Sequence, residues 1–100
     1  GAQLVLDDKG YVLEGNALAQ QHLDASGTSL QGKALIGWLA ADDAPRVQAW
    51  LDQALARKEA TSLALVLRVP AREGRAVIAA ARTNPLAPGV LLAWVDAPPV

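Results

Sequence analysis

The order of the hydrophobic patterns along this chain constrains its fold more than any other feature. Two short strand-like runs open the sequence, one stretch with the 3.6-residue period of an amphipathic helix lies in the middle, and three strand-like runs close it. Strands that group at the two ends of a chain, with helices between them, form an antiparallel sheet that carries the helices on one face. The sequence therefore predicts an α+β fold with a five-stranded antiparallel sheet, in a single domain spanning residues 1–100.

The N-terminal part predicts a β-hairpin followed by a short helix. Residues 4–6 and 11–13 are β-prone, and Gly10 between them can take the positive φ that a tight turn requires. Asn16 then precedes a run of helix formers at 17–23 and is a suitable N-cap for that helix.

A loop and a longer helix are predicted next. Residues 24–29 are polar and contain a glycine, and the short apolar run 34–39 fits one or two helical turns. The acidic pair at 42–43, followed by a proline, suits the capped start of a helix that we expect to end near Lys58. The apolar side chains of this helix recur on one face, at Val47, Trp50, Leu51, Ala54 and Leu55.

Three strand-like runs, 61–69, 75–83 and 90–95, complete the sheet. A hairpin connection at 70–74 with a glycine at its tip joins the first two, and the proline- and glycine-rich segment 84–89 separates the second from the third. Side chains alternate along a strand, so one set faces the helices and the other set faces away.

A pocket for a small ligand is expected between the sheet and the long helix. Specific ligand sites normally include a few convergent polar groups, and no unpaired polar residue stands among the candidate positions. This absence favours the alternative of a fully packed core. The candidate lining residues are Val47, Trp50, Leu51, Leu65, Leu67, Val69, Leu92 and Trp94.

Five short motifs resemble the PAS family, and together they cover nearly the whole chain in that family's order. The resemblance implies a sensory domain of a larger signalling protein, such as a bacterial sensor histidine kinase, that binds a small ligand or relays a signal through protein contacts without chemistry of its own. The alternative is a ligand-free dimerisation or docking module with a packed core. The motifs are the hairpin 4–16, the glycine-lysine step at 32–35, the acidic pair at 42–43, the charged turn at 72–75 and the final strand 89–96.

The resemblance also bears on cofactors. Haem-binding PAS proteins ligate iron from a histidine on or near the long helix, but residues 43–58 contain none, and the only histidine, His22, is expected at the surface of the first helix. Flavin-binding relatives carry a glutamine where this chain has Trp94, and the chain has no cysteine to form a flavin adduct. We therefore expect neither haem nor flavin, a core-filling Trp94, and at most an unidentified small ligand.

No catalytic or metal site is expected. A chain without cysteine has no thiolate ligand or cysteine nucleophile, and one histidine cannot form a histidine-rich metal site. The acidic pair 42–43 has a sufficient role as a helix cap, and the pair 7–8 near Asp24 matches no calcium-loop spacing. No serine lies in a hydrolase motif.

A second copy of the chain is the expected partner. The outward positions of the sheet are small or apolar, where a solvated face would carry polar residues. In the PAS family such a face is covered by a flanking N-terminal helix or by a second sheet, and this sequence begins directly at its first strand. We therefore expect a homodimer, with a flanking helix of the full-length protein as the alternative cover. The candidate interface residues are Ala64, Val66, Leu91, Ala93 and Val95.

The charge pattern favours neither nucleic acid nor a membrane as a partner. Nine basic and ten acidic residues are scattered along the chain and give a net charge of -1. No apolar run approaches the roughly twenty residues of a membrane span. The absence of cysteine fits a reducing compartment, so we expect a cytoplasmic domain that acts with an output domain of the same chain.

Overall fold

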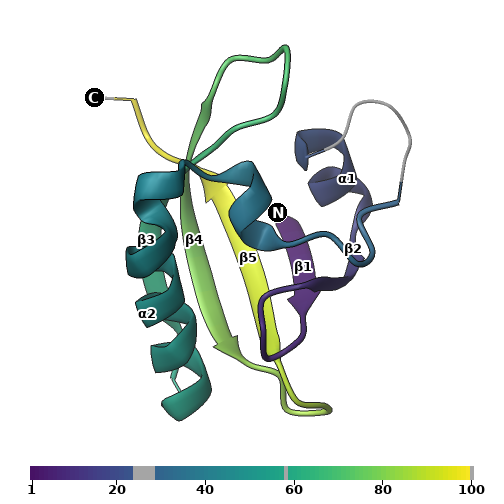
Figure 1. Cartoon of the computed structure of the whole chain (residues 1–100), viewed down its shortest axis with the longest axis vertical. Helices are drawn as coiled ribbons and strands as arrows, with labels where there is room; N and C mark the ends of the chain where they lie inside the picture. The colour runs from purple at the N-terminus through teal and green to yellow at the C-terminus, as the bar shows by residue number, and fades with distance from the viewer. Residues whose placement is uncertain (24–28, 58, 100) are drawn as a thin grey trace.

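In the computed structural model, five antiparallel strands form one sheet, and the helices cover one of its faces (Figure 1). The structure describes residues 1–23, 29–57 and 59–99. The predicted α+β fold with a five-stranded antiparallel sheet is confirmed. The elements are β1 (Ala2–Leu6), β2 (Val12–Gly15), α1 (Ala17–Leu23), η1 (Leu35–Trp38), η2 (Ala41–Asp43), α2 (Ala44–Ala56), β3 (Thr61–Leu67), β4 (Arg75–Thr83) and β5 (Val90–Asp96).

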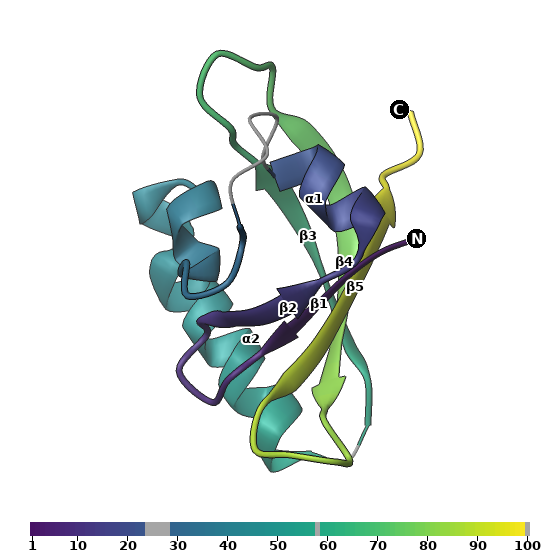
Figure 2. The ribbon, with the colours of Figure 1, turned by 90° about the vertical axis from the view of Figure 1, so that its right-hand side faces the viewer.

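The central strand of the sheet is the last one in the sequence. The strand order is β2-β1-β5-β4-β3, so β5 joins the N-terminal hairpin to the C-terminal one (Figure 2). The register places Ala93 between Gln3 of β1 and Ala80 of β4, and Ala80 lies opposite Ser62 of β3. Because side chains alternate, this pairing puts all four residues on the same face of the sheet.

The N-terminal hairpin and its helix form largely as predicted. Gly10 has a φ of 88°, and the carboxylate of Asp7 accepts hydrogen bonds from the backbone N–H groups of Lys9 and Tyr11 at 2.9 Å. Tyr11 forms only an isolated bridge, so β2 begins one residue later than expected. The predicted cap is confirmed, because Oδ1 of Asn16 accepts a hydrogen bond from the third helical residue at 3.0 Å.

The predicted acidic cap of the long helix is wrong. The chain enters α2 directly from η2, and Asp43 already has helical backbone angles, with φ -82° and ψ -11°. An N-cap residue normally has extended angles that aim its side chain at the free N–H groups, and Asp43 makes no such bond. It pairs with Arg46 at 3.1 Å instead. The predicted helix end near Lys58 lies outside the described residues, as do residues 24–28 of the predicted loop 24–29; α2 ends at Ala56.

The amphipathic stripe of α2 packs against the inner face of the sheet. Four of its five predicted positions are buried, and Leu55 is partly buried against them. Trp50 donates its indole N–H to the carbonyl oxygen of Thr61 at 3.0 Å, so its polar atom has a partner inside the core. Among the described residues no polar or charged residue is buried. The core is therefore held mainly by apolar packing, with the indole bond of Trp50 as a polar contact inside it.

Two connections of the sheet differ from expectation. β3 ends at Leu67 rather than Val69, because the next N–H, that of Arg68, donates to the carbonyl of Trp38 at 2.7 Å and so leaves the strand ladder. The left-handed residue of the β3–β4 connection is Ala71, with a φ of 64°, rather than the glycine predicted at its tip.

Gly89 makes the connection into β5 possible. Its φ is 141°, and a Cβ atom at this position would collide with the carbonyl oxygen of Leu6. Only glycine fits this close approach of two backbone segments.

Candidate functional site

The predicted pocket residues gather in the core between α2 and the sheet. Seven of the eight are buried, and Val69, which follows β3, is partly buried against them. Surface hollows lined by Leu92 and by Trp94 are separate from the groove that residues of α2 line. Val47 and Leu51 line a separate surface groove of about 280 Å³ beside the β1–β2 turn. Whether the predicted set ever opens around a ligand stays a prediction.

Trp94 is buried in the core, as expected, and is 3% exposed. Its indole N–H donates a hydrogen bond of 2.9 Å to Nδ1 of His22, across 72 positions of sequence. The two ring centroids are 6.0 Å apart, and the rings are tilted by 39°. His22 was expected at the open surface, but it is half-buried against this indole. A histidine that accepts at Nδ1 carries its proton on Nε2 and is neutral.

Charged residues surround this His22–Trp94 pair at the end of the sheet. Burial lowers the pKa of His22 from its usual value, the positive charges of Arg75 and, more weakly, Arg72 lower it further, and Asp96 opposes them. Arg75 and Asp96 form an ion pair of 2.9 Å between β4 and β5. Arg72, in the β3–β4 connection, donates to the carbonyl oxygen of Gln21 at 2.8 Å and so holds the same end of α1.

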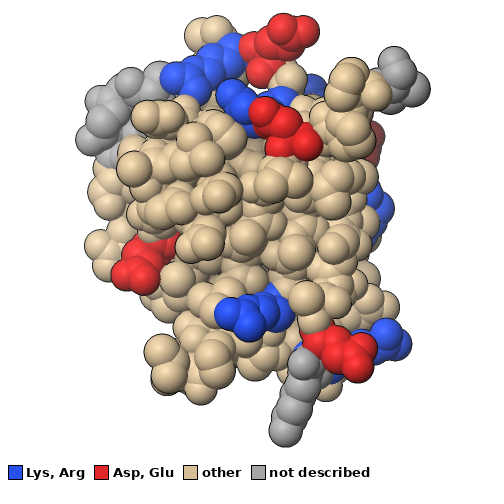
Figure 3. Space-filling model, turned by 180° about the vertical axis from the view of Figure 1, so that it is seen from behind, with Lys and Arg blue, Asp and Glu red and all other residues tan. Residues whose placement is uncertain are grey.

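The outer face of the sheet is the second candidate site. All five predicted interface residues lie on it, because each pairs across the strands with another outward residue or follows the same alternation. Val95 is 61% exposed and Val66 is 37% exposed. Seen from behind, this face is largely free of charge across its middle, and the charged side chains lie toward its margins (Figure 3).

A shallow trough crosses the middle of the outer face at right angles to the strands. Its floor is the cross-strand row Gln3, Ala93, Ala80 and Ser62, whose central members are alanines. A row of larger side chains borders it on each side. The two bordering rows are Glu14, Val5, Leu91 and Arg82 on one side, and Val95, Ile78 and Ala64 on the other.

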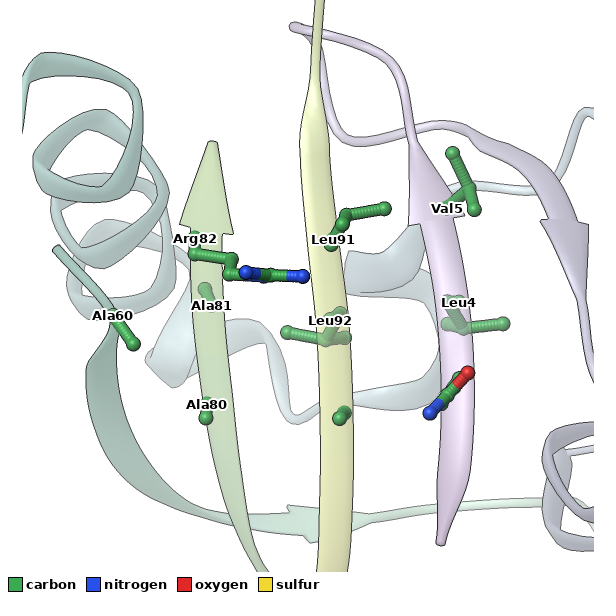
Figure 4. Close-up of a pocket in the computed structure, with 10 residues that line it drawn as sticks. Leu4, Val5, Ala60, Ala80, Ala81, Arg82, Leu91 and Leu92 are labelled. Atoms are coloured by element: carbon green, nitrogen blue, oxygen red, sulfur yellow. The ribbon is translucent and has the colours of Figure 1, made fainter. Parts of the chain in front are cut away.

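A pocket of about 200 Å³ lies along this trough (Figure 4). Arg82 extends over it from β4 toward β5, and Leu91 extends from β5 toward β1. Its neighbour on the other side of the alanines is a second hollow, lined in part by Ile78 and Val95. The trough thus gives the outer face relief as well as apolar character.

Glu14 and Arg82 stand at opposite ends of one bordering row. Glu14 pairs with Val5, Val5 with Leu91, and Leu91 with Arg82. Neither charged side chain forms an ion pair with any other residue that the structure describes. The sequence reasoning missed β4 and β1 as parts of this face, although the same alternation applied to 75–83 would have found Ile78 and Ala80.

Among the residues that the structure describes, no group of three or more histidine, aspartate or glutamate side chains is close enough together to hold a metal ion. No helix in that part of the chain is long and apolar enough to cross a membrane.

Comparisons with solved structures give the fold. The chain superimposes on the PAS domain of a protein from Colwellia psychrerythraea with a TM-score of 0.79 at 12% identity, over 96% of this chain and 85% of that one. It superimposes with the same TM-score of 0.79, at 10% identity, on the PAS-B domain of Drosophila melanogaster Cycle with bound ethylene glycol. This match covers 96% of this chain and 99% of that one. A domain of an HTR-like protein from Haloarcula marismortui superimposes with a TM-score of 0.71 at 17% identity, over 95% of both chains. No protein-family model matches the sequence, and no curated protein matches it. The chain thus has the PAS fold.

Proposed function

We propose that this domain with the PAS fold is a sensory and signalling module that works through protein contacts, and that it pairs with a second copy of itself at the outer sheet face. One observation carries the proposal. The middle of that face is apolar, whereas the solvated face of an antiparallel sheet normally alternates to polar residues. Contiguous apolar patches of this kind mark interaction sites on soluble domains.

The packing of the core supports contacts over ligand binding. The positions where a ligand would lie are occupied by buried side chains, among them the indoles of Trp50 and Trp94. Both indole N–H groups already have acceptors within the chain. A small ligand would find few polar groups to fix its orientation there. The rival function, a ligand-binding sensor, requires these side chains to move apart.

The charges on the outer face favour one arrangement of the two copies. In the order β2-β1-β5-β4-β3, the strands of Glu14 and Arg82 lie at equal distances on either side of the line between β1 and β5. With strands spaced about 4.8 Å apart, each residue lies roughly 7 Å from that line. A two-fold axis along the line, between two facing sheets, sets Glu14 of one copy opposite Arg82 of the other.

The same axis sets apolar residues against each other at the centre of the interface. Val5 of one copy comes opposite Leu91 of the other, because β1 and β5 flank the axis in the same cross-strand row. Each contact occurs twice in such a symmetric dimer. The apolar centre supplies the association free energy, and the two ion pairs at its sides set the register.

Light scattering of the purified domain and its variants tests this pairing. We expect a dimer at concentrations of about 100 μM, the micromolar affinity range of weak interfaces, and a monomer for Ala93→Glu, which places a carboxylate in the trough. Leu86→Glu is the matched control, since Leu86 is 92% exposed on the loop before β5 and lies off this face. A monomeric unmodified domain contradicts the proposed pairing.

Charge exchange tests the arrangement separately. Glu14→Arg and Arg82→Glu should each weaken the dimer, because each brings like charges together twice. The double variant should restore the dimer. Weakening without restoration would mean that the two copies pair in another orientation.

Native mass spectrometry separates the contact module from the ligand-binding rival. We expect the mass of the chain without an added small molecule, and a colourless solution without the absorbance of flavin near roughly 450 nm or of haem. A co-purified small molecule would favour the rival. As the host protein we propose a cytoplasmic regulator such as a bacterial sensor histidine kinase, with the residue motifs described above as its support.

A further inference from the structure

We propose that His22 is a proton-sensitive latch: the neutral imidazole holds the C-terminal end of α1 against β5 through Trp94, and protonation releases that end. The inference is independent of the pairing at the outer face. It starts from the hydrogen bond of 2.9 Å between the indole N–H of Trp94 and Nδ1 of His22. A buried indole N–H needs an acceptor, and here the acceptor is a group that titrates near neutral pH.

Protonation removes this acceptor completely. In the imidazolium form both ring nitrogens carry hydrogen and only donate, so Nδ1–H would face the N–H of Trp94. Trp94 is 3% exposed and cannot turn its N–H to water without leaving the core. The half-buried His22 lies at the end of a short helix and can move more easily. When two N–H groups face each other, α1 is therefore the element that we expect to move.

The charged groups around His22 lie on β4, on β5 and in the connection between β3 and β4, whereas β1, against which α1 packs, carries none. Arg75 on β4 and Arg72 in the β3–β4 connection disfavour a further positive charge, and Asp96 on β5 favours one. Asp96 is already paired with Arg75 at 2.9 Å. Burial of the imidazole is the largest of the effects that lower its pKa. The surroundings as a whole thus favour the neutral form of the latch and lower the pKa at which it takes up a proton.

The rest of α1 determines which part is released. Asn16 holds the N-terminal end, since its Oδ1 accepts from the N–H groups of Gln3 and Ala19 and its amide donates to the carbonyl oxygen of Gly1. None of these groups titrates near neutral pH. The C-terminal end depends on the latch, on the bond from Arg72 to the carbonyl oxygen of Gln21 and on the burial of Leu23 in the core. Release therefore removes one of three restraints on this end of α1 and loosens it beside the β3–β4 connection.

NMR spectroscopy tests the latch, because the chain has one histidine and three tryptophans. We expect the His22 imidazole to titrate below about 6.5, its usual value, and the indole N–H resonance of Trp94 to shift with the same midpoint. The indole N–H of Trp50 is the internal control, since its acceptor is a backbone carbonyl that does not titrate. Amide exchange at residues 20–23 should lose protection about tenfold through that midpoint, as for one lost hydrogen bond to a buried donor.

Two variants separate the latch from general acid destabilisation. His22→Asn offers an amide oxygen near the position of Nδ1 and cannot titrate, so α1 should stay equally protected across the pH range. Trp94→Phe keeps an aromatic ring but removes the donor, so the pKa of His22 should rise above its value in the unmodified chain. A His22 that titrates at or above the usual value, or an α1 whose protection does not follow the titration of the unmodified chain, overturns the proposal.

Discussion

Replacing Trp94 by alanine tests how much of the fold depends on one side chain. A buried indole removes about 200 Å² of apolar surface from water, which at about 25 cal/mol per Å² gives an upper limit near 5 kcal/mol. Trp94 is 3% exposed and central in the sheet, so nearly all of this surface is lost. The cavity collapses in part, and we expect Trp94→Ala to lower the free energy of unfolding by about 3–5 kcal/mol. The imidazole of His22 can bond to water instead, so it adds little.

Equilibrium unfolding in urea measures this loss, provided that the slope m is unchanged. Trp94→Phe should lose the free energy that belongs to the smaller buried ring area and only about 1 kcal/mol more, because it gives up one hydrogen bond. Leu86→Ala is the matched control on the loop before β5, and its 92% exposure predicts a change within about 0.5 kcal/mol. A loss below about 1 kcal/mol for Trp94→Ala would show that the indole does not fill the core.

Three further expectations follow from the packing and from His22. Gly89→Ala should destabilise the domain by more than about 2 kcal/mol, since its Cβ meets the carbonyl of Leu6, and an unchanged urea midpoint would contradict this. Asn16→Ala should cost about 1–2 kcal/mol and expose the start of α1 to amide exchange, because the cap, the bond to Gln3 of β1 and the bond to Gly1 are lost together. The pKa of His22 is lowered on folding, so the unfolded chain binds more protons below about pH 6.5. Stability should be constant above that pH and fall as the pH drops toward the folded pKa, and His22→Asn should remove this dependence.

Local patterns were sufficient to predict most of the elements. The bounds of β4 and α1 match the predicted ranges, because a turn or cap residue marks their ends. The predictions failed where a distant backbone group decides the outcome. Val69 was placed in a strand by its β-propensity, yet the carbonyl of Trp38 takes the N–H of Arg68 and ends the strand earlier. Propensity contains no information about such a partner.

The candidate site also has features that the sequence predicted and features that it could not predict. The alternation of side chains identified Leu91, Ala93 and Val95 as one outward set, and the structure places them so. It could not show that Glu14 and Arg82 end the same row, because that row depends on the register of four strands. The bond between His22 and Trp94 was equally inaccessible, since it joins residues 72 positions apart.

The two proposed contacts meet on β5. Trp94 faces inward to His22, while Ala93 and Val95 on either side of it face outward into the proposed pairing surface. Loss of the bond from His22 removes one restraint on Trp94, and we expect this change to reach its two outward neighbours through the backbone of β5. Thermodynamic linkage makes this coupling reciprocal. If protonation of His22 weakens the pairing by a given free energy, pairing lowers the pKa of His22 by the equivalent of the same free energy. An identical pKa of His22 in the paired domain and in the Ala93→Glu monomer would mean that the two sides of β5 act independently.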